Sequence, residues 1–265
     1  MISYNNLISV ITPAYNCANT IEETILSVKS QTYKNWEMLI VDDCSKDNTV
    51  EIVKRYSLED HRIKLICLEQ NSGSATARNT AIQHATGKYI ALLDSDDLWK
   101  PEKLERQLRF METHRYAFTF TAYDIFKNAS DVGRRIFEVP KSINYKQYLR
   151  NSIIGCLTVM VDKDQIPDFH MESGYLEDVL TWMYYLKNGV VAYGLNENLA
   201  SYRLSSGSKS AKKIKNAQRY YECLKQQDGV GTPLRLFSQI GYIYHAIKKR
   251  LFSKKTKNEY VVSNK

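Results

Sequence analysis

The stretch YIALLDSDD, residues Tyr89–Asp97, joins a continuous apolar run to three carboxylates within four residues. An apolar run of this kind predicts a strand buried on both faces of a parallel sheet. Three neighbouring carboxylates repel one another unless a cation neutralises them, and hard oxygen ligands favour Mg²⁺ or Mn²⁺. The stretch therefore predicts a buried strand that ends at a divalent metal site. The alternative is a solvated acidic turn that caps the next helix.

Three more apolar runs precede this strand, at residues 7–12, 36–41 and 63–68, with helical patterns between them. This alternation predicts an α/β fold with a Rossmann-like, mostly parallel sheet flanked by helices. Because ligands bind beyond the carboxyl ends of strands in open parallel sheets, we expect the polar residues at these ends to form one site. They are Pro13, Tyr15 and Asn16, then Asp42 and Asp43, and finally Asp94, Ser95, Asp96 and Asp97.

The carboxylates of Asp42 and Asp43 can accept a hydrogen bond from a uracil imide or a ribose hydroxyl. The structural alternative is that they cap the helix that follows. Since Asp47 can cap that helix alone, we expect Asp42 and Asp43 to have no structural role.

Two further segments carry candidate site residues. Arg78 lies in a Gly-containing loop that enters a helix, where backbone N–H groups suit phosphate and Arg adds paired donors. The loop matches neither a P-loop nor a dinucleotide-binding fingerprint. Glu177 and Asp178 open a predicted helix, where acidic residues are ordinarily explained by the helix dipole. They are also the best candidates for a general base outside the acidic run.

The cysteine pattern and the lack of apolar spans predict a protein of the cytoplasm. The five cysteines are scattered and form no CxxC pair, which argues against a zinc site or a disulfide framework and fits a reducing compartment. The N-terminus does not have the pattern of a signal peptide, and no run approaches the roughly 20 apolar residues that a membrane span needs.

The net charge of +8 is unevenly distributed, because residues 208–265 hold 14 Lys and Arg against three Asp and Glu. We expect a basic helical tail that seeks anionic partners. Its apolar stripe predicts a helix that either docks on the preceding domain or lies in an anionic membrane surface. No nucleic acid partner is expected, because base-stacking aromatics and recognised binding motifs are absent. The stripe consists of Leu236, Ile240, Ile243, Ile247 and Leu251.

The order and spacing of four segments resemble glycosyltransferase family 2, whose fold is GT-A: residues 10–16, 41–45, 73–79 and 93–97. Glu177–Asp178 and Tyr202–Arg203 look like two later landmarks of that family. The resemblance implies a GT-A catalytic domain at 1–207 and a separate tail at 208–265. Within the domain it implies a nucleotide-sugar-binding half at 1–115 and an acceptor-binding half at 116–207.

The resemblance also implies an inverting, metal-dependent transfer of a hexose from a UDP-sugar. By this analogy Asp42 or Asp43 holds the uracil or ribose, and Arg78 lies near the base and phosphates. Asp96 binds Mn²⁺ or Mg²⁺ together with Asp94 or Asp97. The other nucleotide-sugar contacts implied are Pro13, Tyr15, Asn16, Ser95 and Arg203.

For the acceptor side, the resemblance makes Asp178 the base that deprotonates the acceptor hydroxyl, with Glu177 as the alternative. Relatives often carry a His two residues after the Tyr-Arg pair, where this chain has Ser205. Arg203 and Ser208 are the expected substitutes for that His.

Small enzymes of this kind often assemble bacterial O-antigen, capsule or related surface glycans. The resemblance therefore implies a glycan acceptor carried on undecaprenyl diphosphate, and a protein peripheral to the inner face of the cell membrane. One rival is a nucleotidyltransferase acting on sugar phosphates, but no Gly-rich triphosphate loop lies near the first strand. The other is a non-enzymatic sugar-nucleotide-binding or scaffold protein, and the intact set of acidic residues argues against it.

Overall fold

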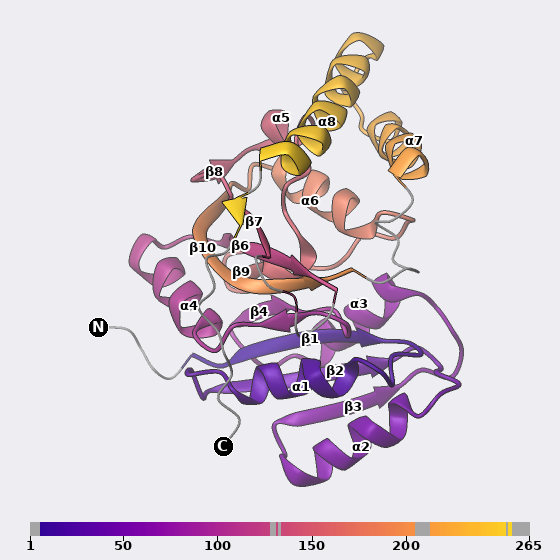
Figure 1. Cartoon of the computed structure of the whole chain (residues 1–265), viewed down its shortest axis with the longest axis vertical. Coiled ribbons are helices and arrows are strands. Elements are labelled where there is room, and N and C mark those ends of the chain that lie inside the picture. The colour runs from indigo at the N-terminus through magenta and orange to yellow at the C-terminus, as the bar shows by residue number, and fades with distance from the viewer. Residues whose placement is uncertain (1–5, 128–130, 132–133, 205–212, 253, 256–265) are drawn as a thin grey trace.

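The computed structural model describes residues 6–127, 131, 134–204, 213–252 and 254–255 (Figure 1). Its N-terminal part is a parallel sheet in the order β3-β2-β1-β4. All four predicted strands are present and parallel, which confirms the α/β fold. Their bounds are β1 (Ile8–Ala14), β2 (Trp36–Asp42), β3 (Ile63–Cys67) and β4 (Tyr89–Leu92).

Helices cover both faces of this parallel part. On one face, Ile11 and Leu92 share a core cluster with Ala81 of α3 (Ser74–His84). On the other face, Val10 packs in a second cluster with residues of α1, α2 and α4. Burial on both faces explains why the strands are continuously apolar instead of alternating. The three helices are α1 (Ile21–Lys29), α2 (Thr49–Glu59) and α4 (Lys103–His114).

The sheet becomes mixed in its C-terminal part, where β9 (Met160–Asp162) is antiparallel to both β4 and β6 (Phe118–Phe126). The longest strand, β10 (Ala192–Arg203), runs parallel to β6. It was not predicted, since Asn196, Glu197 and Asn198 interrupt its apolar pattern near two register shifts. Short strands complete the sheet: β5 (Leu98–Trp99), β7 (Arg135–Phe137), β8 (Ser142–Ile143) and β11 (Lys254–Lys255).

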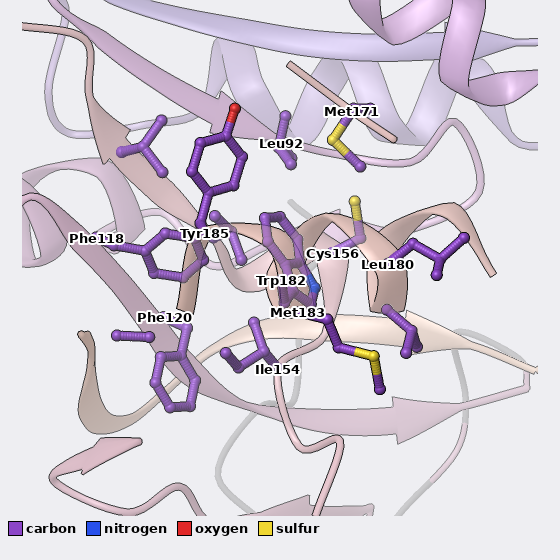
Figure 2. Close-up of a cluster of buried hydrophobic side chains, with 14 of the residues drawn as sticks. Leu92, Phe118, Phe120, Ile154, Cys156, Met171, Leu180, Trp182, Met183 and Tyr185 are labelled. Atoms are coloured by element: carbon purple, nitrogen blue, oxygen red, sulfur yellow. The ribbon is translucent and has the colours of Figure 1, made fainter. Parts of the chain in front are cut away.

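The helix α6 (Glu177–Lys187) packs on the sheet through a large aromatic cluster. Figure 2 shows Trp182 of α6 beside Phe118 of the sheet, in a cluster that also contains Met183 and Leu92. The rings of Trp182 and Phe118 meet edge to face with centroids 5.2 Å apart. Burial of a side chain such as Phe118 stabilises the fold by about 1.5–3 kcal/mol. The packing fixes α6, whose first turn carries the two predicted base candidates.

The helix α7 (Lys213–Lys225) joins the same core. Tyr220 is fully buried, and its hydroxyl donates to the backbone oxygens of Tyr148 and Leu149 at 3.2 and 3.0 Å. Its neighbour Leu224 is also fully buried. The first part of the predicted tail therefore docks on the domain, against α5 (Tyr145–Tyr148).

The last long helix, α8 (Thr232–Phe252), docks on only one side. The ring of Tyr242 stacks on Tyr220 at 4.1 Å, and Gly241 allows close approach, because a Cβ there would lie 2.9 Å from the Cβ of Arg150. The predicted apolar stripe faces away, with Leu236, Ile240, Ile243 and Ile247 exposed by 42 to 66%. Leu251 lies outside the side chains that the structure describes. Among the described helices, none has the length and hydropathy to cross a bilayer.

Candidate active site

Two threonines, one in α1 and one directly before it, hold the acidic turn at residues 94–97. Thr20 and Thr24 both donate to the backbone oxygen of Ser95 at 3.0 Å. Thr24 also donates to the backbone oxygen of Asp97 at 2.9 Å. These hydroxyl contacts fix the turn where β4 ends. Neither threonine was predicted as a site residue, because their partners lie more than 70 residues away in the sequence.

Asp97 points into the protein. Its side chain is fully buried, and its Oδ1 accepts from the backbone N–H of Arg203 at 2.8 Å. Burial, together with the charges of Asp96 and Asp94, raises the pKa of Asp97 well above its usual range. Asp97 therefore ties β10 to the acidic turn in this structure.

Arg203 makes a second link to the same turn, because its Nε donates to the backbone oxygen of Asp96 at 2.7 Å. Its Nη2 forms an ion pair with Glu23 at 2.5 Å. Glu23 was not among the predicted site residues. Its charge holds the guanidinium beside the acidic turn, so that Arg203, one of the two substitutes expected for the missing His, lies near the predicted metal ligands. The other expected substitute, Ser208, lies outside the described residues.

Asp94 and Asp96 remain partly exposed at the edge of the sheet. Burial and the charge of Asp94 raise the pKa of Asp96 to about 6. Two repelling carboxylates of this kind fit Mg²⁺ or Mn²⁺, which typically bind one or two carboxylates and fill other positions with phosphate oxygens. Within the described residues no group of three or more His, Cys, Asp or Glu side chains surrounds a common point. A divalent metal ion here would therefore be held by the carboxylates of Asp94 and Asp96 and by the phosphate oxygens of a ligand.

The two carboxylates at the end of β2 have structural partners, so the prediction that they have no structural role was wrong. Asp43 accepts from the backbone N–H groups of Ser72 and Gly73 at 2.6 and 2.9 Å. Those N–H groups were expected to suit phosphate, and Asp43 occupies them. Asp42 accepts from the N–H of Ser45 at 2.9 Å through Oδ2, while its buried Oδ1 accepts no hydrogen bond from the described residues. Asp42 thus keeps one acceptor atom that is unpaired but buried.

Residues at the end of β1 and directly after it lie beside the loop that follows β2. Asn16 has a φ of 47°, and its side-chain oxygen accepts from the N–H of Lys46 at 2.7 Å. This contact ties the end of β1 to the loop after β2. Pro13 lies in β1 in register with Val41, and Tyr15 is 49% exposed. Tyr15 is therefore accessible to a ligand, whereas the Asn16 side chain holds the loop after β2.

Arg78 connects the acidic turn to α6. It is nearly buried in α3 and forms ion pairs with Asp94 and with Glu177, the latter with Nη1 and Oε1 3.1 Å apart. The hydroxyl of Ser74 donates to the same oxygen of Glu177 at 2.5 Å. Residues distant in the sequence thus meet at one place. Ser74 was not predicted, because nothing in its local pattern indicates a partner 103 residues later.

The two base candidates have different surroundings. Glu177 is 7% exposed and is engaged by Ser74 and Arg78. Asp178 accepts only the N–H of Val179 in the hydrogen bonds described, at 2.8 Å. Burial, and then the charge of Glu177, raise the pKa of Asp178 to about 6. A carboxylate with a pKa near neutrality suits proton transfer.

Comparison with known proteins shows the family of this chain. The sequence profile of the family described as Glycosyl transferase family 2 matches residues 9–161, more than half of the chain. The chain belongs to this family. The matched range contains β2 with Asp42, α3 with Arg78, and the acidic turn, so this edge is the candidate active site of a glycosyltransferase.

Curated relatives extend the similarity along nearly the whole glycosyltransferase chain. A Bacillus subtilis protein named "Putative teichuronic acid biosynthesis glycosyltransferase TuaG" is 42% identical over 95% of this chain and 100% of its own. The Escherichia coli protein WfgD is 41% identical over 94% of this chain and 97% of its own. It is named a UDP-Glc:alpha-D-GlcNAc-diphosphoundecaprenol beta-1,3-glucosyltransferase.

Solved structures confirm the GT-A fold of this glycosyltransferase. Staphylococcus aureus TarS 1-349 in complex with UDP-GlcNAc has a TM-score of 0.68 at 20% identity, covering 91% of this chain and 72% of that one. The mannosyltransferase PcManGT from Pyrobaculum calidifontis, in complex with GDP-Man and Mn²⁺, has a TM-score of 0.68 at 20% identity. That match covers 94% of this chain and 71% of PcManGT. At this identity the likeness concerns the fold.

Proposed function

We propose that this glycosyltransferase moves a hexose from a UDP-sugar, with inversion, to a sugar carried on a lipid diphosphate such as undecaprenyl diphosphate. The observation that carries the proposal is the Arg78 bridge, which places the Asp94 carboxylate and the first turn of α6 around one guanidinium. A candidate metal ligand and a candidate base thereby share one edge of the sheet. The name of the relative WfgD supports both the donor and the acceptor class.

On the donor side, the buried and unpaired Oδ1 of Asp42 is the proposed acceptor for the uracil imide or a ribose hydroxyl. Asp43 keeps the loop before α3 closed against the end of β2. Asp94 and Asp96 would hold Mn²⁺ or Mg²⁺ on the diphosphate, and this cation would neutralise the charge that develops on departing UDP. Asp97 and Arg203 hold the turn that presents both carboxylates.

On the acceptor side, Asp178 takes the proton of the acceptor hydroxyl as that oxygen bonds to the anomeric carbon. The bond between this carbon and the UDP oxygen breaks on the opposite face, so the configuration inverts and no covalent enzyme intermediate forms. Glu177 acts through position, because Ser74 and Arg78 hold it and its charge keeps the pKa of Asp178 high.

The protein acts at a membrane surface in this proposal, through the exposed stripe of α8. An exposed apolar helix face beside a basic end is typical of helices that lie in the plane of an anionic bilayer. The sequence places Lys248, Lys249 and Arg250 directly after the stripe residue Ile247. A membrane-bound enzyme would meet a lipid-linked acceptor where that acceptor resides.

The direct test is transfer itself. Purified enzyme with Mn²⁺ is given a panel of UDP-sugars and a synthetic GlcNAc-diphosphate-lipid, and UDP release is compared with product formation. The expected result is a glycosylated lipid formed with inverted configuration from at least one donor, and loss of activity with a chelator. Nucleoside triphosphate turnover with sugar phosphates would favour a nucleotidyltransferase. Absence of UDP release from every donor would overturn the proposal.

A further inference from the structure

An arginine on α7 is oriented but has no acidic partner among the described residues. The guanidinium carbon of Arg219 lies 2.9 Å from the centroid of the Tyr175 ring. Its Nη1 is buried and donates to no described residue. Leaving a buried donor of a charged group unpaired is costly. By contrast, the other two arginines near the site pair with carboxylates, Arg78 with Glu177 and Arg203 with Glu23.

This arginine lies between the candidate base and α8. Tyr175 comes three residues before Asp178 and is 44% exposed. Cys223 follows Arg219 by one helical turn, so both share a face of α7. Cys223 packs in the same core cluster as Val179, the residue that follows Asp178 on α6, so this face of α7 is turned toward α6.

The other side of α7 contacts the helix that carries the exposed apolar stripe. Gln239 of α8 donates to the backbone oxygen of Ala217 at 2.9 Å. Figure 1 shows α7 beside α8 and above α6. The helix α7 therefore contacts both the segment before α6 and the helix that carries the stripe.

We propose that Arg219, oriented by Tyr175, binds the diphosphate of the lipid-linked acceptor. This inference rests on the acceptor class in the proposed function. In such an acceptor only the sugar separates the reacting hydroxyl from the diphosphate, and the lipid continues from the other phosphate. A guanidinium donates two parallel hydrogen bonds to phosphate oxygens, and stacking on a ring pre-orders its plane. Arg219 thus recognises the diphosphate that connects the sugar to the lipid.

The test compares two acceptors, one with a diphosphate between sugar and lipid and one without it. Arg219→Gln and Arg219→Lys are assayed with GlcNAc joined to a short lipid through a diphosphate, and with GlcNAc joined directly to an alkyl chain. For the diphosphate acceptor we expect Arg219→Gln to raise KM about 10- to 100-fold, as loss of a charge-assisted pair predicts. The Lys variant should lie between Gln and wild type, because a point charge cannot pair in parallel. KM for the alkyl acceptor should not change.

The matched control is Arg109→Gln, which removes an exposed guanidinium from α4. Thermal unfolding and UDP-sugar affinity check that each variant is folded. An equal rise of KM for both acceptors, or no rise, would overturn the diphosphate site.

Binding of farnesyl diphosphate, measured by calorimetry, separates this inference from the proposed function because it needs no transfer. Weaker binding by Arg219→Gln than by Arg109→Gln supports the site even if no sugar transfer is found. Equal binding by the two variants refutes the site even if transfer is confirmed.

Discussion

The carboxyl edge of the parallel strands and the outer surface of α7 and α8 differ in how firmly partners hold their side chains. At the edge, Asp43, Asp97 and Arg78 are each fixed by backbone or ionic partners. On α8, large apolar side chains are exposed, and Arg219 of α7 pairs with no described carboxylate. A preformed polar site suits a water-soluble nucleotide sugar. An open amphipathic surface suits a partner that arrives with its own lipid and charge.

The largest expected effect comes from removing the base at the border of the two regions. Asp178→Asn should lower the transfer rate by about 10²- to 10⁴-fold, because the amide cannot take the acceptor proton. UDP-sugar affinity should stay within about twofold, since in our proposal Asp178 does not contact the nucleotide. Steady-state kinetics and calorimetric titration with UDP-sugar measure the two quantities.

Asp164→Asn is the matched control, because this carboxylate is exposed and lies beyond β9. It should leave transfer unchanged. Transfer by Asp178→Asn near the wild-type rate would reassign the base, with Glu177→Gln the next variant to assay.

Breaking the Arg78 bridge at the edge should cost stability. Arg78→Gln leaves Asp94 and Glu177 without their shared cation, and unpairing a buried charge costs about 3–5 kcal/mol. Urea unfolding should therefore show a loss of about 3 kcal/mol, part of which Glu177→Gln restores in the double variant, because one unpaired charge is then gone.

Arg55→Gln is the comparison for this bridge, because Arg55 pairs with Glu22 where both side chains are about half exposed. Such surface pairs are worth about 0–1 kcal/mol. If the two arginine variants lost equal stability, Arg78 would not be a structural bridge.

The sequence predicted the rigid edge better than the open surface, for physical reasons. Buried parallel strands are recognisable as continuous apolar runs, and their ends locate Asp42 and the acidic turn. Local pattern cannot tell which carboxylate of the turn points inward, so Asp97 was grouped with Asp94 and Asp96. Contacts such as Ser74 with Glu177 depend on how α6 packs on the sheet, which no local pattern contains. The stripe of α8 was visible in the sequence, but its exposure was not.

The proposed membrane contact of α8 can be tested by adding charge to its exposed apolar stripe. Ile240→Glu with Ile247→Glu should weaken binding to vesicles containing anionic phospholipid by at least about tenfold, because two apolar side chains can no longer be buried in the bilayer. Activity on a short, water-soluble acceptor should stay the same. Sedimentation with the vesicles measures the binding.

Leu58→Glu changes an apolar side chain that is 89% exposed on α2, so it controls for charge on a different surface. Equal loss of vesicle binding in this control, or full binding by the α8 variant, would exclude α8 as the membrane contact.

The smallest effect is expected from pH, and it distinguishes the base from the metal ligands. The pKa of Asp178 is raised to about 6, so the ionised form that accepts a proton predominates above that value and is lost below it. At saturating Mn²⁺ and UDP-sugar, the rate should fall only about twofold between pH 8 and pH 6, and about tenfold per unit further down. Because the pKa of Asp96 also lies at about 6, UDP-sugar affinity is measured at each pH as the control. If affinity and rate fall together, the acidic turn and not Asp178 sets the profile; if affinity stays constant while the rate falls, the proton acceptor lies on the α6 side of the Arg78 bridge.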